Sequence, residues 1–326
     1  MWQDSYEAPQ SQLWSGRVDD TDKAIRYHQC VKLVNLTSKN PIATEKKNIA
    51  IVGFKSDEGV KRNKGRPGAY GGPDAFRKKL GSLSFHGSEK IDIYDFGNIC
   101  VDDGDLEKGQ QALADILFTL RSNGFIPFVI GGGHEVSWGH YQGLAKAGLA
   151  ESLQIINFDA HFDLRPKDKK GMGSSGTPFK QISDYCKDKL VDFNYSCYGI
   201  QEISNHGGLF ETAHNLNVDY ILAEEFATDT PKLMTQIKKD IAKLDSIYMT
   251  VCLDVFADYV APGVSARSPL GLIPAQVLPL IKYIVQSGKL AAFDIAELSP
   301  AYDVDDKTAS LAASLFAQIL AYKAQN

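Results

Sequence analysis

The sequence predicts an α/β fold: a three-layer sandwich in which a mostly parallel sheet is covered by helices on both faces. Short apolar runs rich in β-branched residues recur along the 326 residues, and stretches with helical spacing of apolar side chains lie between them. The apolar runs are hydrophobic nearly throughout, which is typical of parallel strands buried on both faces. Because no repeat, low-complexity tract or proline-rich linker interrupts the chain, we expect one domain over residues 1–326, with residues 1–47 as a less regular N-terminal extension.

Each expected element follows from its own local pattern. The apolar runs that we expect to form strands are Ile49–Phe54, Ile91–Phe96, Ile126–Ile130, Leu153–Phe158, Tyr195–Ile200, Ser246–Leu253 and Leu290–Leu298. A helix is expected over residues 106–121 because Leu113, Ile116 and Leu120 fall on one stripe at helical spacing. The same spacing predicts helices over Lys232–Leu244, Pro274–Gln286 and Thr308–Ala324.

The charge balance and the cysteines exclude several classes of protein. The 35 Lys and Arg against 40 Asp and Glu give a net charge of −5, whereas sequence-independent nucleic-acid binders normally carry a basic excess. The longest apolar runs, such as Phe125–Ile130, are far shorter than the ~20 residues of a membrane span. No signal-peptide pattern is evident, and five irregularly spaced cysteines suit a reducing compartment. We therefore expect a cytoplasmic protein that binds neither nucleic acid nor membrane.

A glycine-rich turn follows the expected strand Ile126–Ile130. In parallel sheets, the residues that carry chemistry collect in loops at the carboxyl ends of strands. Gly131, Gly132 and Gly133 let the backbone turn tightly and approach another group closely, and His134 comes next. The phosphate-binding spacing Gly-x-x-x-x-Gly-Lys is absent. Taken alone, this segment favours a glycine turn with an incidental histidine.

Acidic residues and a histidine follow the expected strand Leu153–Phe158. In an extended segment, alternate residues point to one side, so Asp159, His161 and Asp163 are expected to converge. Two carboxylates and an imidazole at the mouth of a buried strand are costly without a counter-charge, and a divalent metal supplies that charge. A solvated polar loop is the alternative, but the alternation after an apolar strand favours the metal.

Two further strands end in residues of the same types. Cys252 and Asp254 alternate at the end of Ser246–Leu253. A lone cysteine in a strand is more often a small core residue than a ligand, and only its alternation with Asp254 favours a ligand role. In Leu290–Leu298 we interpret Asp294 as a buried structural carboxylate, whereas Glu297, near the strand end, is expected in a site.

The candidate ligands from these four strands are numerous enough for two metal ions that share bridging groups. Two such ions lower the pKa of a water and polarise an electrophile. The candidate metal ligands are His134, Asp159, His161, Asp163, Cys252 and Asp254.

These segments carry a family resemblance. The Gly-Gly-Gly-His-Glu turn, the Asp-Ala-His-Phe-Asp segment, the run from Asp254 to Pro262 and the Asp-Ile-Ala-Glu strand end resemble the ureohydrolase (arginase/agmatinase) superfamily, in the usual order, over about residues 49–325. Finer details resemble its formimidoylglutamase branch. They lie at Asn63–Arg66, Asn157–Arg165, Ser174–Phe179 and Ala261–Ala266.

The resemblance implies an arginase-like fold, an activity and a cofactor. Enzymes of that branch hydrolyse the linear amidine N-formimidoyl-L-glutamate to L-glutamate and formamide in histidine degradation, by a hydroxide activated by two Mn²⁺ per chain. It implies that one ion takes His134, Asp159 and Asp163, and that the other takes Asp159, His161 and Asp254. The position shared by both ions, an aspartate in arginases, is Cys252 here.

That cysteine raises two questions. Thiolates prefer softer metals than manganese, so the occupancy of the two positions is open. A thiol beside a metal is also oxidisable, and a disulfide between Cys252 and Cys30 that blocks metal loading is a further hypothesis.

The resemblance also implies roles for residues around the metals. Asp163 is expected to carry the proton to the leaving amine, and Glu297 to bind the amidine nitrogens. Phe179 stands where arginases have a histidine, so the arginine-specific proton shuttle is missing. The acidic substrate is expected to be bound by Arg165, Ser174, Ser175, Asn63 and Arg66. A solvated loop is the alternative for the basic residues at 61–66.

Two other functions stay open. The first is another ureohydrolase, such as a guanidinobutyrase or an agmatinase, with the same metal chemistry. The second is a metal-poor, non-catalytic assembly subunit, which only Cys252 favours. The resemblance further implies a homo-oligomer, either a trimer or a hexamer.

Overall fold

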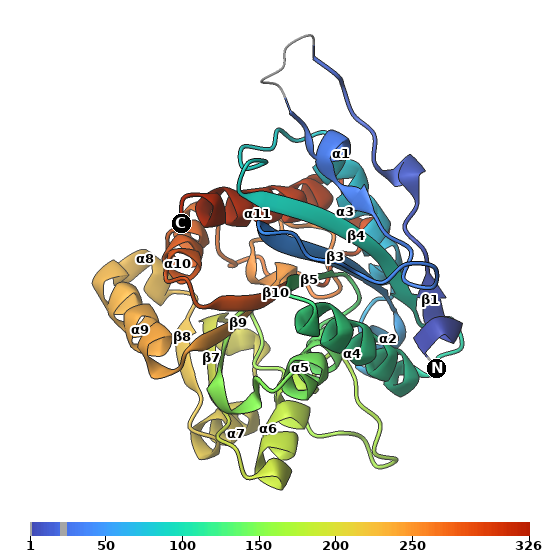
Figure 1. Cartoon of the computed structure of the whole chain (residues 1–326). Helices are drawn as coiled ribbons and strands as arrows, with labels where there is room; N and C mark the ends of the chain where they lie inside the picture. Colours follow the sequence, from blue (N-terminus) through green and yellow to red (C-terminus); the bar gives the residue numbers. More distant parts are fainter. Residues whose placement is uncertain (1, 20–24) are drawn as a thin grey trace.

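The computed structural model, which describes residues 2–19 and 25–326, confirms the expected three-layer α/β sandwich (Figure 1). Its sheet has 10 strands in the order β1-β4-β3-β5-β10-β9-β6-β7-β8, with β2 beside β4. The pairing of β1 with β4 is antiparallel, and the other pairings between these strands are parallel. The strands are β1 (Tyr6–Glu7), β2 (Lys32–Leu33), β3 (Lys47–Lys55), β4 (Ile91–Cys100), β5 (Phe125–Ile130), β6 (Leu153–Phe158), β7 (Tyr195–Ile200), β8 (Asp219–Leu222), β9 (Ser246–Cys252) and β10 (Leu290–Ala296).

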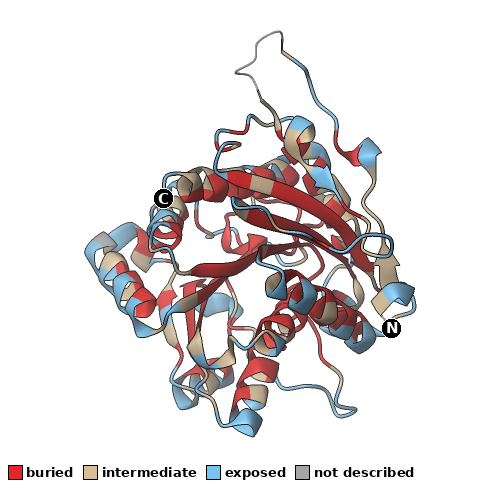
Figure 2. Ribbon diagram, viewed as in Figure 1, coloured by how far each residue is buried: buried red, intermediate tan, exposed pale blue. Residues whose placement is uncertain are grey.

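Helices cover both faces of the sheet. One hydrophobic core lies between the sheet and α3, α9, α10 and α11, and two others lie against α4 and against α5, α6 and α7. Figure 2 shows the central strands buried along their length, as the continuous apolar runs require. The α-helices are α1 (Tyr27–Cys30), α2 (Glu58–Arg62), α3 (Gly72–Gly81), α4 (Leu106–Ser122), α5 (Val136–Lys146), α6 (Pro178–Lys189), α7 (Gly207–Asn215), α8 (Glu225–Thr228), α9 (Thr230–Lys243), α10 (Pro274–Gln286) and α11 (Lys307–Ala324).

The expected strands and helices all form, with small changes at their ends. Strands β6 and β7 and helix α10 have the predicted bounds. Strands β9 and β10 end before the predicted residues, because Leu253–Val255 turns into a 3₁₀ helix and Glu297 adopts a left-handed φ of 68°. Strand β8, a short and partly exposed edge strand, was not predicted, and neither were the shorter helices α3, α5, α6 and α7.

The glycine turn after β5 needs its glycines. Gly131 and Gly132 have φ of 99° and 73°, a region that favours glycine. A Cβ atom on Gly131 would lie only 2.5 Å from Pro73 Cγ. The carbonyl of Gly132 accepts a hydrogen bond from the Glu297 amide at 2.9 Å, which joins the ends of β5 and β10. Tight turning and close approach, the two properties expected of this segment, are therefore confirmed.

The N-terminal residues complete one edge of the sheet. Strands β1 and β2 each pair with β4. Trp14 is buried and donates its indole N–H to Asp95 Oδ2 at 2.8 Å, beside the buried Arg77 guanidinium. Among the described residues, no helix has both the length and the apolar character needed to cross a membrane.

Candidate metal centre

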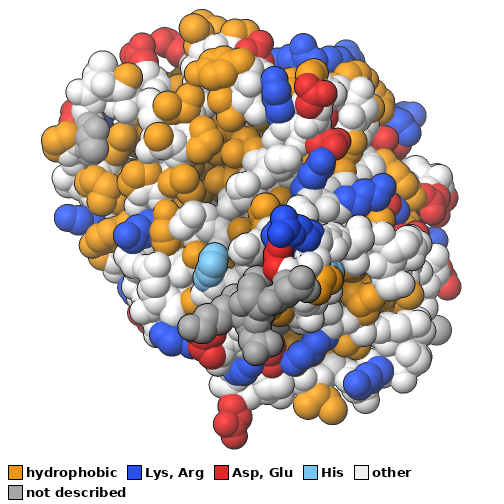
Figure 3. Space-filling view, turned by 90° about the horizontal axis from the view of Figure 1, so that it is seen from above, with side chains coloured by type: hydrophobic (Ala, Val, Ile, Leu, Met, Phe, Trp, Pro, Cys, Tyr) orange, Lys and Arg blue, Asp and Glu red, His pale blue; other side chains and the backbone are white. Residues whose placement is uncertain are grey.

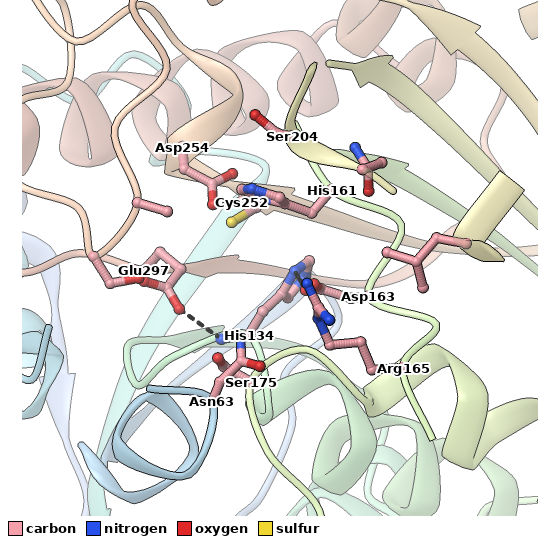
Figure 4. Close-up of a pocket in the computed structure, with 14 residues that line it drawn as sticks. Asn63, His134, His161, Asp163, Arg165, Ser175, Ser204, Cys252, Asp254 and Glu297 are labelled. Atoms are coloured by element: carbon pink, nitrogen blue, oxygen red, sulfur yellow. Dashed lines mark hydrogen bonds and ion pairs between the residues drawn. The ribbon is translucent and has the colours of Figure 1, made fainter. Parts of the chain in front are cut away.

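Four neighbouring strands at the middle of the sheet place the candidate ligands. The order β5-β10-β9-β6 brings their carboxyl ends side by side, although they are distant in sequence. His134 follows β5, Glu297 follows β10, Cys252 ends β9, and Asp159 follows β6. A cavity of about 130 Å³ opens at this edge, and Figure 4 shows the side chains turned towards it. Its lining residues are Asn63, His134, His161, Asp163, Arg165, Ser175, Ser204, Asn205, Leu209, Cys252, Asp254, Ser265, Ala266 and Glu297.

The ligand atoms form two groups that share Asp159. In the first group, His134 Nδ1 lies 2.7 Å from Asp159 Oδ2 and 2.9 Å from Asp163 Oδ2. In the second group, His161 Nδ1 lies 3.1 Å from Asp254 Oδ2 and 3.6 Å from Asp159 Oδ1. Asp159 therefore offers one carboxylate oxygen to each group, as a residue that bridges two cations must.

Cys252 belongs to the first of these groups. Its Sγ, one nitrogen of His134 and one carboxylate oxygen of Asp159 lie within 4.8 Å of one another, as do ligand atoms of Asp159, His161 and Asp254 in the second group. Burial and the nearby Asp159 charge raise the pKa of the Cys252 thiol well above its ordinary value. A cation at this position would have to displace the thiol proton, because the thiolate is the form that binds metals.

The convergence of Asp159, His161 and Asp163 is confirmed, but the reason predicted for it is wrong. Strand β6 ends at Phe158, and Asp163 has a left-handed φ of 49°, so these residues do not continue an extended strand. Asn205 holds the loop instead. Its side-chain N–H donates to Ala160 O at 2.9 Å and its Oδ1 accepts the Phe162 amide at 3.1 Å. The backbone on either side of His161 is thereby fixed.

The charges in the cavity are unbalanced without a cation. Burial and the charge of Asp159 raise the pKa of Asp163 to about 6. Burial and the charge of Asp254 raise the pKa of Glu297 to about 8. Burial alone would raise the pKa of Asp159, but its two histidine neighbours hold it below the ordinary value. Carboxylates crowded in this way repel one another when ionised.

The donor atoms fit two divalent cations. Asp254 Oδ1 and Glu297 Oε2 are buried and find no hydrogen-bond partner among the described residues. Buried acceptors are normally satisfied, so these atoms indicate that a further group belongs in the cavity. Carboxylate oxygens and imidazole nitrogens suit manganese and similar metals, and Cys252 is the one soft donor.

The proposed disulfide between Cys252 and Cys30 is wrong. Both cysteines are free. Cys30 ends α1 and lies near Lys46 and Asp92, at the amino ends of β3 and β4, whereas Cys252 lies at the carboxyl end of β9. The two thiols therefore lie near opposite ends of the strands. A disulfide requires Cα atoms within about 7 Å, so these two cysteines cannot form one in this fold.

Three of the five residues expected to bind substrate line the cavity: Arg165, Asn63 and Ser175. The Arg165 side chain is exposed at the mouth and makes no hydrogen bond or ion pair to any residue that the structure describes. Arg62, from the basic cluster, is instead ion-paired to Glu58 at 3.0 Å and to Glu107 at 2.7 Å. Arg165 is therefore the guanidinium available to a ligand.

Arg66 and Ser174 do not line the cavity, so the structure does not place either residue in direct contact with a substrate bound in it. Arg66 donates to Ser265 O at 3.0 Å and to Val264 O at 2.8 Å, and its guanidinium lies 4.2 Å from the Tyr302 ring centroid. It supports the wall that contains Ser265. Ser174 lies in an adjoining hollow beside Arg165. Neither position was visible in sequence spacing, because both depend on how loops fold back.

Several residues near the centre were missed by sequence reasoning. Thr250 Oγ1 lies 3.0 Å from His134 Nε2, and the alternation that drew attention to Cys252 would also have found Thr250. No local signal pointed to Ser204 or Asn205, which come from a loop. Ser265 lies in the segment Ala261–Ala266 that carries the resemblance, but no role was predicted for it. Asp294, as expected, is a buried hydrogen-bonded carboxylate outside the cavity lining.

Phe179 has a packing role. It is fully buried, stacks on Tyr195 with ring centroids 4.3 Å apart, and meets the His134 ring at an angle of 82° with centroids 5.2 Å apart. It lies behind the metal centre rather than in the cavity. No proton donor therefore stands at this position.

Comparisons with known proteins agree with the geometry. The sequence matches the arginase family over residues 47–321. A formimidoylglutamase of Legionella pneumophila is 44% identical over 317 residues, 97% of each chain, and one of Clostridium tetani is 41% identical over 325 residues, 97% of this chain and 96% of the relative.

Solved structures share the fold. Formimidoylglutamase from Bacillus subtilis has a TM-score of 0.80 at 23% identity and covers 95% of both chains. Formiminoglutamase from Trypanosoma cruzi with Mn²⁺ has a TM-score of 0.77 at 24% identity, covering 87% of this chain and 97% of that one. Since the family match spans most of the sequence and the two relatives are more than 40% identical over nearly its full length, the chain belongs to the arginase family.

Proposed function

We propose that this protein hydrolyses N-formimidoyl-L-glutamate to L-glutamate and formamide, using two Mn²⁺ ions per chain. The observation that carries the proposal is the pair of ligand groups that share Asp159 and open towards the guanidinium of Arg165, which pairs with no residue in the described part of the chain. Relatives named formimidoylglutamase at 40–44% identity support the substrate. A T. cruzi formiminoglutamase structure with Mn²⁺ supports the metal.

In this proposal the first ion is held by His134, Asp159 and Asp163, and the second by Asp159, His161 and Asp254. Cys252 borders the first position. When bound, such a pair of cations supplies a water of lowered pKa and a Lewis acid that polarises the amidine. The chain's own side chains must then orient the substrate and move protons.

Glu297 and Asp163 have the positions for these tasks. Glu297 lines the cavity, and its Oε1 accepts the His134 amide at 3.2 Å. Its Oε2 has no hydrogen-bond partner within residues 2–19 and 25–326, so it can accept an amidine N–H. Asp163 lines the same cavity, and its Oδ2 lies beside His134 Nδ1. We assign it the transfer of a proton to the leaving nitrogen, because no histidine stands at position 179.

At the mouth, Arg165 would bind a substrate carboxylate through its planar fork, with Asn63 and Ser175 beside it. Ser174 and Arg66 would act behind these residues, by supporting the loops that carry them. A dianionic substrate suits this mouth better than the cation agmatine does.

We further propose that the protein is a single-domain cytoplasmic homo-oligomer, a trimer or a hexamer. Figure 3 shows hydrophobic side chains gathered over a broad part of one face. Large exposed apolar areas of this kind commonly mark contacts between proteins. Size measurement in solution by light scattering tests this assembly.

A turnover assay with manganese-loaded protein tests the function. The substrates are formimidoylglutamate, arginine, agmatine and guanidinobutyrate, and glutamate and urea are measured. We expect glutamate from formimidoylglutamate and no urea from the others. Urea from guanidinobutyrate or agmatine would instead identify another ureohydrolase. Less than one metal ion per chain and no turnover would indicate a non-catalytic subunit.

Replacing Arg165 by Met is expected to raise KM for formimidoylglutamate about 10- to 100-fold, with kcat within a few-fold of the unmodified protein. A charge-assisted hydrogen bond contributes about 1.5–3 kcal/mol, and this one acts on a carboxylate remote from the reacting carbon. The matched control is Lys167→Met, which removes a charge from the same exposed loop but does not line the cavity. Equal KM values for the two variants would contradict the role of Arg165.

A further inference from the structure

A chain of buried polar side chains runs from the metal centre into the core. His134 Nε2 lies 3.0 Å from Thr250 Oγ1. Tyr248, two residues earlier on the same face of β9, donates its hydroxyl to Asp294 Oδ2 on β10. The ring nitrogen Nδ1 of His140, on α5, lies 2.7 Å from the same oxygen. All five side chains are at most 1% exposed.

This chain is poorly explained by stability alone. A buried ionic or polar group is often no more stabilising than an apolar group of the same size. Asp294 Oδ1 and His140 Nε2 are buried without a hydrogen-bond partner among the described residues, which adds a cost. A core position between β9, β10 and α5 would be filled more simply by apolar residues.

The hydrogen bonds of the chain have one consistent direction. His140 Nδ1–H and the Tyr248 hydroxyl both donate to the Asp294 carboxylate. The oxygen of Tyr248 remains an acceptor, and Thr250 follows two residues later on the same face of β9, opposite Asp294 in the register of β9 and β10. Once Thr250 donates to Tyr248, its own oxygen accepts from His134 Nε2.

This direction determines which nitrogen of His134 carries the proton. With Nε2–H donating to Thr250, the lone pair is on Nδ1, which is the nitrogen that faces Asp159 and Asp163. We propose that Tyr248, Asp294 and His140 are positioning residues that act through Thr250 to hold His134 in its metal-binding tautomer and orientation. The inference rests on the metal site of the proposed function.

Residues that hold a metal ligand through hydrogen bonds, without binding the metal themselves, typically lower metal affinity by 10- to 100-fold when they are replaced. Tyr248→Phe removes the hydroxyl that donates to Asp294 beside Thr250 and leaves the ring that packs on His140, 4.7 Å away between centroids. We therefore expect Tyr248→Phe to weaken the binding of one of the two Mn²⁺ ions about 10-fold or more. The other ion, held by His161 and Asp254, should keep its affinity.

Tyr198→Phe is the matched control. Tyr198 is equally buried, on the neighbouring part of the sheet in β7, and its hydroxyl donates to the buried Asp240 at 2.5 Å. Removal of this hydroxyl therefore costs the same kind of tyrosine–carboxylate bond, and among the described residues the hydroxyl bonds to Asp240 and to no metal ligand. The backbone carbonyl of Tyr198 accepts the Asp159 amide at 3.0 Å, and the substitution leaves that bond in place. Titration with Mn²⁺, followed by electron paramagnetic resonance and calorimetry, should give two wild-type affinities for Tyr198→Phe.

A second pair of variants keeps the test independent of the folding of Tyr248→Phe. Thr250→Val should weaken the same ion, and Thr250→Ser, which retains the hydroxyl, should restore its affinity. Weakened binding in Thr250→Val together with wild-type affinities in Tyr248→Phe would overturn the proposal, because the effect would then stop at Thr250. Wild-type protein that binds no manganese would overturn the proposed function itself, and this inference with it.

Discussion

Replacing Asp159 by Asn is expected to remove both metal ions and to lower kcat/KM by about 10³-fold or more, which corresponds to about 4 kcal/mol of transition-state stabilisation. Asp159 is the residue common to the two ligand groups. Its Oδ2 faces His134 and its Oδ1 faces His161. An amide in its place offers one neutral oxygen and turns an N–H group towards the other cation position, so neither ion is properly held.

The metal content of purified protein, measured by elemental analysis beside turnover, checks this result. Asp254→Asn is the contrasting variant, because Asp254 belongs to one ligand group only. It should lose one ion and keep the other. Circular dichroism should show that both variants keep their helices and strands. Two ions per chain and wild-type turnover in Asp159→Asn would contradict the arrangement.

Replacing Arg77 by Met is expected to lower the free energy of unfolding by about 3–5 kcal/mol, the usual cost of leaving one partner of a buried ion pair alone. Arg77 is 1% exposed and Asp95 is fully buried. The guanidinium donates to both carboxylate oxygens of Asp95 at 2.8 Å, and also to Asn98 Oδ1 at 2.7 Å. Met fills similar space but leaves the buried Asp95 carboxyl group without its guanidinium partner, with the Trp14 indole N–H as a remaining side-chain donor.

Urea denaturation followed by fluorescence measures this loss. Lys146→Met is the control, because Lys146 pairs with Asp115 at 2.6 Å at the surface, where both side chains are about 40% exposed. Surface pairs contribute roughly 0–1 kcal/mol, so this variant should unfold close to the wild-type midpoint. If Arg77→Met also unfolded at that midpoint, the buried pair would not be a main source of stability at this edge of the sheet.

Part of the fold could be predicted because a strand that is buried on both faces is apolar nearly throughout its own sequence. Strands β6 and β7 are covered on both faces, so Leu153–Phe158 and Tyr195–Ile200 are apolar nearly throughout and their bounds were predicted correctly. Strand β8, at the edge and partly exposed, carries a weaker pattern and was missed. The candidate ligands were visible for a similar reason, since polar residues directly after buried strands must have partners.

Loop residues were harder to place. Arg66 and Arg165 both looked like ligands for a carboxylate, and only the fold shows that Arg66 is bound to the carbonyls of Val264 and Ser265. The sequence does not show how far apart Cys30 and Cys252 lie, and only the fold places them near opposite ends of the strands. Spacing in sequence contains no information on such contacts, because they depend on the path of distant segments.

The sequence by itself therefore determined which segments are buried, which residue types end the central strands, and which family the chain resembles. The tertiary structure decided the strand order β5-β10-β9-β6, which places His134, Glu297, Cys252 and Asp159 at one edge of the sheet. It also decided the turn of the Asp159–Asp163 loop and its attachment to Asn205. Hydrophobic patterning depends only on neighbours in the chain, whereas strand order and loop path depend on packing between segments that are far apart in sequence.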